Sequence, residues 1–232
     1  MDDQNAVTFT RAGVAAGFRA SIPVGLGVFG YGLVYGALAR EAGLSAAEAL
    51  LTSALVFAGT AQFIVLEQWA TPPPVAAMVL TALVVNTRHL LMGAALRPWF
   101  GGLPRSRVYG SAFFLNDESW ALTMQDLRAG SGNGAFLLGS GLALFLAWVG
   151  ATAAGRVAGA AIEDPTRWGL DVAFTAVFAA LLVGLWEGRR SLRPWAVAAV
   201  VAVAAERWLP GVWYILLGGV AGSVVGAIGD GD

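Results

Sequence analysis

The stretch Ala135–Ala154, AFLLGSGLALFLAWVGATAA, contains no charged side chain. A helix needs about 20 mostly apolar residues to cross the hydrocarbon core of a bilayer, so this stretch is a complete candidate span. Similar candidates are Phe18–Ala39, Ala49–Leu66, Val75–Leu96, Val108–Leu127 and Leu170–Trp186, with a last region, Trp195–Ile228, that Glu206–Pro210 interrupts. The sequence therefore predicts an all-α integral membrane protein with about seven transmembrane helices, some broken or re-entrant, in one polytopic domain covering residues 1–232.

The composition supports this class and excludes several functions. Hydrophobic residues make up 57% of the chain and charged residues 12%, whereas a typical soluble domain carries about 25% charge. The net charge of −1 offers no basic field for nucleic acid. Without Lys the chain has no Walker A site for ATP, and without Cys and with one His it has no thiolate or HExxH metal site, so we expect no cofactor.

Arginines gather in three groups that bear on orientation. They are Arg11 with Arg19, Arg97 with Arg105 and Arg107, and Arg189 with Arg190 and Arg193. The positive-inside rule would place all three in the cytoplasm. If every candidate span crosses, however, the middle group falls on the opposite side from the other two. Either that loop breaks the rule or some segments are re-entrant, with Val75–Leu96 the best candidate because Asn86–His89 interrupts it. We expect a cytoplasmic N-terminus.

Two further patterns concern the later part of the chain. Trp195–Ile228 is either one broken helix with an extension or two short helices that meet inside the membrane. Leu50–Gly59 (LLTSALVFAG) resembles Asp171–Ala180 (DVAFTAVFAA), which suggests repeat halves 18–96 and 135–228 with 108–127 between them. Transporters often carry such repeats, although apolar sequences also match by chance.

Polar residues interrupt two of the predicted spans, where burying an unpaired polar group is costly. Gly59-Thr60-Ala61-Gln62 lies deep in the second span and either loosens the helix to bind a ligand or packs closely with Gln62 bonded to a neighbour. Asn86-Thr87-Arg88-His89 lies in the middle of the third span. A helix break there would free backbone amides for an anion, and the alternative is a tight turn between two short helices.

Acidic residues lie in two other spans. Asn116-Asp117-Glu118-Ser119 falls inside the fourth span, and its two acids point about 100° apart on a helix, so they do not share one partner. One of them could bind a substrate ammonium while the other binds Arg88 or a proton; the alternative is a purely structural salt bridge to Arg88. Asp171, at the start of Leu170–Trp186, is interpreted as a helix N-terminal residue favoured by the helix dipole.

Three of these motifs together carry a family resemblance. Phe57–Phe63 (FAGTAQF), Asn86–Leu96 (NTRHLLMGAAL) and Asp117–Ser119 (DES) resemble, in order and spacing, the AzlC family of branched-chain amino acid permeases. The resemblance implies a bacterial inner-membrane exporter of valine, leucine, isoleucine and related amino acids, methionine among them. It also implies a small membrane partner of the AzlD type that is needed for export.

The site residues can be matched to a zwitterion with an apolar tail. The backbones of Gly59–Gln62 (Gly59, Thr60 and Gln62 among them) and of Asn86–His89, with the Arg88 side chain, are predicted to take the carboxylate. Asp117 or Glu118 is predicted to take the ammonium. An apolar wall is expected from Phe57, Phe63 and Phe114. Uphill export would use the proton gradient, with His89, Asp117 and Glu118 as proton carriers.

Intramembrane catalysis and passive conduction are the two alternatives to transport. An intramembrane enzyme would need a nucleophile with a base, and His89 lies beside an arginine rather than in a recognisable triad, so we expect no enzyme. A passive channel or facilitator for small polar solutes or cations is the main alternative, because the acidic pair could select cations.

Overall fold

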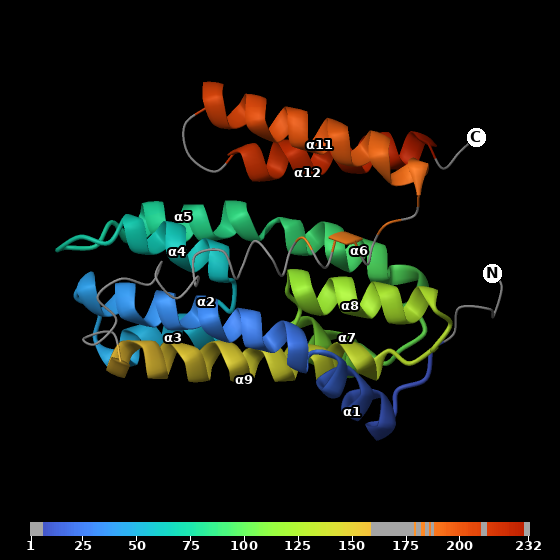
Figure 1. Ribbon diagram of the computed structural model, residues 1–232, viewed down its shortest axis with the longest axis horizontal. Helices are drawn as coiled ribbons and strands as arrows, with labels where there is room; N and C mark the ends of the chain where they lie inside the picture. The colour runs from blue at the N-terminus through green and yellow to red at the C-terminus, as the bar shows by residue number, and fades with distance from the viewer. Residues whose placement is uncertain are drawn as a thin grey trace.

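A computed structural model describes residues 7–158, 179, 182–183, 186, 188–209 and 213–229. The regular elements over these residues are α-helices, which confirms the all-α part of the prediction (Figure 1). Their bounds are α1 (Arg11–Ala20), α2 (Ile22–Glu41), α3 (Ala46–Leu55), α4 (Gly59–Glu67), α5 (Val75–Asn86), α6 (Arg88–Phe100), α7 (Arg105–Ala112), α8 (Asp117–Arg128), α9 (Ala135–Ala158), α11 (Arg189–Trp208) and α12 (Trp213–Gly229).

Three described segments are long and apolar enough to cross a membrane. They are Ile22–Glu41, Val75–Phe100 and Ala135–Ala158, with mean hydropathies of 1.6, 1.6 and 1.8. These correspond to the first, third and fifth predicted spans. The predicted total of about seven is not confirmed in the described part of the chain. The sixth span, Leu170–Trp186, falls largely outside that part, as do Asp171 and most of the repeat segment Asp171–Ala180, so the repeat stays a prediction.

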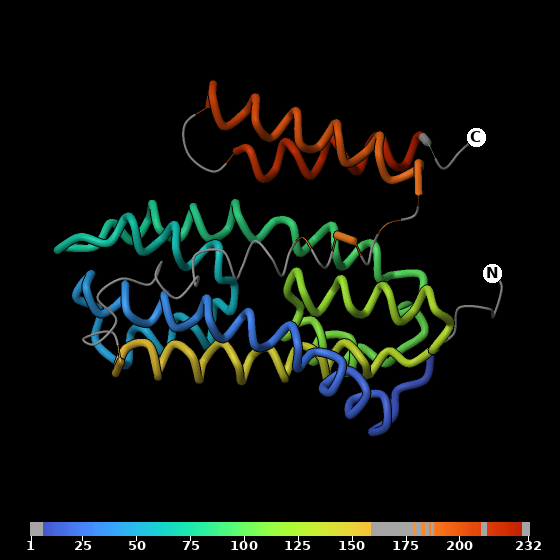
Figure 2. The backbone as a smooth tube through the Cα atoms, viewed as in Figure 1, coloured from blue at the N-terminus to red at the C-terminus, as the bar shows by residue number. Residues whose placement is uncertain are grey.

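The second predicted span, Ala49–Leu66, is not one helix, which corrects the sequence prediction. After α3 the chain passes through Phe57, whose φ of 43° lies in the left-handed region, and α4 begins at Gly59. Figures 1 and 2 show α3 and α4 folded back on each other, and Gln62 Nε2 donates to Ser53 Oγ between them at 3.1 Å. A hydropathy scan takes such a hairpin for a crossing because its two halves together have the length of a span.

The fourth predicted span, Val108–Leu127, is also a pair of short helices rather than a crossing. α7 and α8 are separated by a break, and Asn116 caps the start of α8. Leu103, before α7, and Leu127, near the end of α8, pack in one hydrophobic cluster, so this hairpin returns to the end from which it enters. Figure 2 shows the two hairpins entering from opposite ends of the molecule and reaching its middle.

The third predicted span is more continuous than the sequence suggested. Only Thr87 separates α5 from α6, and its φ of −58° and ψ of −24° are helical. The Thr87 hydroxyl donates to the Val84 carbonyl at 2.6 Å, which bends the helix locally without opening a loop. This stretch is part of Val75–Phe100, which is long and apolar enough to cross a membrane, so the re-entrant shape expected of Val75–Leu96 is found instead in the hairpins α3–α4 and α7–α8.

The last region, Trp195–Ile228, forms two helices rather than one broken helix with an extension. α11 and α12 lie side by side in Figure 1. A Cβ added at Gly218 would press on Ala202, and one added at Gly222 on Ala198, so these glycines allow the two backbones to approach closely.

Helix α9 is the centre of the remaining bundle, with α1, α2, α3, α7 and α8 packed around it. A Cβ at Gly155 would overlap the carbonyl of Leu33 on α2, so this helix pair requires glycine there. A pair of hydroxyl groups joins α3 to α9, with Ser53 Oγ 2.8 Å from Thr152 Oγ1. Small residues and interhelical hydrogen bonds are the usual means of association in lipid.

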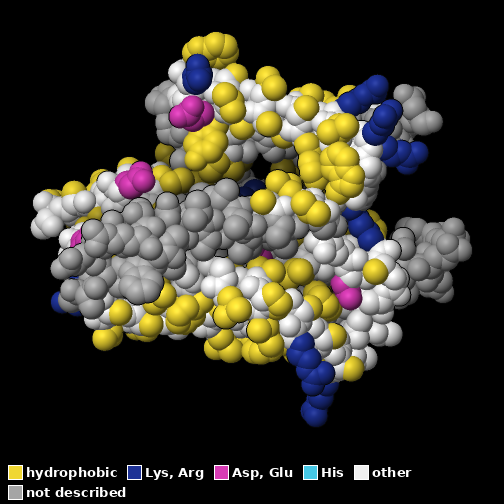
Figure 3. Space-filling view, in the orientation of Figure 1, with side chains coloured by type: hydrophobic (Ala, Val, Ile, Leu, Met, Phe, Trp, Pro, Cys, Tyr) yellow, Lys and Arg dark blue, Asp and Glu magenta, His cyan; other side chains and the backbone are white. Residues whose placement is uncertain are grey.

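The hairpin topology places the three arginine groups at one end of the molecule, which resolves the conflict between their positions and the positive-inside rule. The chain near Val7, the α6–α7 turn at Leu103 and the α8–α9 turn at Gly134 lie together, and α11 begins at the same end in Figure 1. Because α3–α4 does not cross, all three arginine groups belong to this end. Figure 3 shows basic side chains gathered toward it.

Candidate functional site

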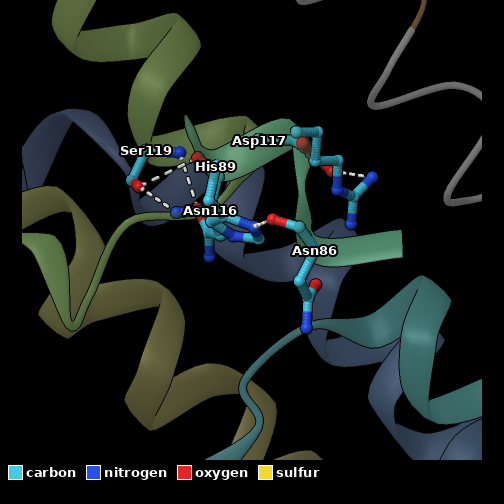
Figure 4. Close-up of polar contacts among 6 residues, drawn as sticks. Asn86, His89, Asn116, Asp117 and Ser119 are labelled. Atoms are coloured by element: carbon cyan, nitrogen blue, oxygen red, sulfur yellow. Dashed lines mark hydrogen bonds and ion pairs between the residues drawn. The ribbon is translucent and has the colours of Figure 1, made fainter. Parts of the chain in front are cut away.

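The breaks in the two hairpins lie beside the bend between α5 and α6, and charged side chains meet there. Arg88 Nη1 lies 2.7 Å from Asp117 Oδ2, which joins the start of α6 to the start of α8 (Figure 4). A small cavity adjoins this ion pair. It is lined by Val28, Tyr31, Phe57, Ala58, Gly59, Thr60, Arg88, His89, Asn116, Asp117, Glu118 and Trp148.

The first turn of α8 holds the two acidic residues of the site, Asp117 and Glu118, in place. Asn116 Oδ1 accepts from the Ser119 amide at 2.8 Å, and Ser119 Oγ accepts from the Asn116 amide at 2.9 Å. This reciprocal cap holds Asp117 and Glu118 in the first turn, where the helix dipole favours negative charge. The side chain of Asp117 turns to Arg88. That of Glu118 lines the cavity at 7% exposure, and no other described residue hydrogen-bonds to its carboxylate.

The α5–α6 bend contributes Arg88, His89 and Asn86. His89 Nδ1 lies 3.0 Å from the Asn86 carbonyl oxygen, which orients the imidazole along the bend (Figure 4). Arg88 Nε and Asn86 Oδ1 are buried without a hydrogen-bond partner among the described groups. Arg88 and His89 line the cavity, whereas Asn86 does not. Arg88 therefore retains an unused donor beside the cavity while its Nη1 holds Asp117.

The start of α4 faces the same cavity through Gly59 and Thr60. Its N-cap residue is Ala58, which offers no side-chain hydrogen bond to the first turn. The first amides of a helix lack intrahelical partners and carry the positive end of the helix dipole. This end of α4 therefore provides backbone donors and a partial positive charge opposite the acids of α8.

Besides Asn86, three predicted site residues do not line the cavity, and they pack against aromatic residues around it. Gln62 Oε1 accepts from Trp148 Nε1 at 3.0 Å, a bond to a neighbour of the kind that the alternative prediction describes, and its role in binding stays a prediction. Phe63 stacks on Tyr31 with ring centroids 4.4 Å apart. Phe114 packs edge-on against Phe145 at 5.4 Å.

Sequence reasoning missed two aromatic residues that line the cavity, Tyr31 on α2 and Trp148 on α9. A signal for Trp148 was available, because tryptophans of membrane proteins concentrate at the two interfaces and Trp148 lies well inside Ala135–Ala154. Tyr31 carries no comparable signal within its apolar stretch. The break before α8 was also visible in principle, since Asn116 and Ser119 have the spacing of a reciprocal helix cap.

The cavity is small in this conformation. The space it leaves for water-sized occupants is about 30 Å³, which is enough for one or two water molecules. The same elements therefore have to move apart before a solute with a side chain can enter.

Comparison with known proteins places the chain in a family. A family model described as AzlC protein matches residues 23–162. The branched-chain amino acid transport protein AzlC of Bacillus subtilis is 29% identical over 182 residues, which is 76% of this chain and 70% of that protein. An uncharacterized membrane protein of Archaeoglobus fulgidus is 30% identical over 175 residues, covering 75% of this chain and 76% of the relative. The inner membrane protein YgaZ of Escherichia coli is 25% identical over 212 residues, which cover 88% of this chain and 85% of that protein.

No solved structure gives a significant match. The chain therefore belongs to the AzlC family of membrane proteins, as its three motifs predicted.

Proposed function

We propose that this protein is a secondary transporter that exports branched-chain amino acids, coupled to protons, across the bacterial inner membrane. The observation that carries the proposal is the meeting of both signs of charge with the start of a half-helix in one cavity between membrane-spanning helices. Broken helices whose N-termini face a mid-membrane site are a recurring design of secondary transporters. The printed name of the Bacillus subtilis relative supports the substrate class.

A zwitterion with an apolar tail matches the groups around the cavity. The amides of Gly59 and Thr60 and the unused Nε of Arg88 suit a carboxylate. The acids at the start of α8 suit an ammonium. Phe57 and Trp148 provide apolar wall for the side chain, with Phe63 and Phe114 behind the lining.

Loading the site requires a conformational change. The free space of about 30 Å³ is too small for an amino acid, so α3–α4 and α7–α8 must separate on one side at a time. Because the hairpins enter from opposite ends, movement of one opens the site toward one face while the other stays closed. This is the alternating access expected of such a transporter.

Proton coupling is proposed for the acids and for His89, which line one cavity. A histidine or a carboxylate that gains a proton when the site faces one side and releases it on the other links the two fluxes. The absence of a Walker A lysine leaves ion gradients as the energy source.

The arginine-rich end is proposed to face the cytoplasm, which puts the N-terminus inside in agreement with the positive-inside rule. The protein is further proposed to act with a small membrane subunit of the AzlD type. Exposed apolar side chains along α5 and α6, including Leu80, Leu83 and Leu90, supply a surface for lipid or for such a subunit.

The test is an efflux assay in cells that express the chain with its small subunit. Cells are loaded with a leucine- or valine-containing dipeptide, and the free amino acid outside is followed over time against cells with an empty vector. We expect faster release that continues above the internal concentration and stops when a protonophore is added. Equal release in the two strains would refute the exporter, and release that only ever runs downhill would favour the passive facilitator.

A further inference from the structure

We propose that the two neighbouring acids of α8 do different work: Glu118 is the cation ligand of the cavity, and Asp117 is a positioning residue that holds Arg88. The inference rests on the proposed function, because the cation in question is the ammonium of an amino acid. It links Glu118 to the ammonium of the ligand and Asp117, through Arg88, to the carboxylate. Binding of ligands that carry only one of these groups measures the two roles separately.

The geometry separates the two carboxylates. Asp117 Oδ2 and Arg88 Nη1 are 2.7 Å apart, and the two side chains are 17% and 21% exposed. Glu118 follows by one residue, so it points about 100° away around the helix. It lies in the cavity wall at 7% exposure, with no hydrogen bond from another described residue. The cap formed by Asn116 and Ser119 locks this arrangement at the start of the helix.

The charges around Glu118 favour a cation there. Among the described residues, the titratable groups that share its cavity are Tyr31 from α2, Arg88 and His89 from α6, and Asp117 from α8. Since Asp117 already neutralises Arg88, Glu118 is the unbalanced negative charge of this described set. A buried carboxylate is tolerated only when it is paired or protonated, so an ammonium or a proton is the complement that Glu118 lacks.

Asp117 is a poor choice for the same task. To bind a cation it would have to release Arg88, and this would leave a guanidinium without a counter-charge in a region of low dielectric constant. Its role is to aim Arg88 so that the Nε group, which has no hydrogen-bond partner among the described residues, remains available to a carboxylate.

Ligands that carry one charge each distinguish these roles. Leucine has both groups, isoamylamine has the ammonium alone, and 4-methylpentanoate has the carboxylate alone. Binding of each to the purified full chain with its small subunit is measured by calorimetry. Glu118→Gln should weaken isoamylamine and leucine about tenfold or more and leave 4-methylpentanoate unchanged, whereas Asp117→Asn should weaken 4-methylpentanoate and leucine and spare isoamylamine.

Controls separate these roles from loss of folding. Asp126→Asn is the matched control, because Asp126 is an acid of the same helix that bonds Ser131 and does not line the cavity; it should bind all three ligands normally. Glu118→Asp keeps the charge and should retain weaker isoamylamine binding. The inference is overturned if Asp117→Asn loses the amine while Glu118→Gln keeps it, or if both variants lose both analogues alike.

The same experiment separates failure of the inference from failure of the proposed function. Wild-type protein that binds isoamylamine through Glu118 but not leucine would contradict the proposed substrate and leave the division of roles standing. If the wild-type protein binds leucine, but Asp117→Asn loses isoamylamine and Glu118→Gln keeps it, the proposed substrate stands and the division of roles between the two acids is contradicted. Absence of binding for all three ligands would refute both.

Discussion

Arg88 and Asp117 form an ion pair, with Nη1 and Oδ2 2.7 Å apart, that connects the bend of the α5–α6 helix to the break in the α7–α8 hairpin. The two residues are 29 positions apart in the sequence and come from segments that enter the membrane differently. The pair therefore fixes the relative position of the elements that would have to move for transport.

Replacing one partner of this ion pair should lower the stability of the protein more than replacing both partners. Arg88→Leu leaves Asp117 without a counter-charge. The loss reaches 3–5 kcal/mol for a fully buried pair, so we expect roughly 2 kcal/mol for these partly exposed side chains. The double variant Arg88→Leu/Asp117→Leu should unfold at a higher temperature than either single variant in detergent. A double variant less stable than both singles would show that the pair is not the source of the loss.

The close approach of α2 and α9 gives a prediction with a control in the same helix. A Cβ at Gly155 overlaps the Leu33 carbonyl, so Gly155→Ala should lower stability by roughly 1–3 kcal/mol. Gly150 has no neighbouring atom within 4 Å, so Gly150→Ala should be neutral or stabilise by up to about 1 kcal/mol. Thermal unfolding of the two variants measures the difference, and equal effects would contradict the packing.

Phe57 offers a test of backbone strain at the site. Its φ of 43° is a left-handed conformation that costs a residue with a Cβ about 1–2 kcal/mol. Phe57→Gly and Phe57→Ala both lose the buried ring, but only glycine relieves the backbone. We expect the glycine variant to be the more stable by about 1 kcal/mol in chemical unfolding, although alanine is usually favoured over glycine. A more stable alanine variant would mean that this turn is not left-handed.

The hairpin topology predicts which loops share a side of the membrane. The chain contains no cysteine, so single cysteines report without interference. Ala42→Cys and Thr71→Cys, which flank α3–α4, should react with an impermeant maleimide from one side, and Gly102→Cys from the other. If α3–α4 were one crossing, positions 42 and 71 would label from opposite sides.

Much of the site was predictable because charge inside an apolar span is rare and must find a partner. Arg88 and Asp117 were expected to meet on that ground, and the start of α4 was identified through Gly59 and Thr60. The contributions of Tyr31 and Trp148 were not predicted, because an aromatic residue within an apolar helix looks the same whether it faces lipid, another helix or a cavity.

The hairpins could not be predicted from hydropathy. Two half-helices together have the length and polarity of one span, and the turn after α3 contains Val56, Phe57 and Ala58, none of which favours a break. The conformation at Phe57 is set by its tertiary surroundings, where its ring is 6% exposed and packs against Phe145. Sequence reasoning placed the break at Asn86–His89 instead, where the backbone stays helical at Thr87.

The most direct measurement is leucine export from dipeptide-loaded cells that carry, with the small subunit, the wild-type chain, Arg88→Gln or Leu146→Ala. Leu146 is 54% exposed on α9, does not line the cavity, and serves as the control. We predict proton-dependent export for the wild type and for Leu146→Ala, and a rate at the level of empty cells for Arg88→Gln at equal membrane abundance. Export by Arg88→Gln equal to that of the wild type, or no export by any of the three, would contradict a branched-chain amino acid transporter that works through this site.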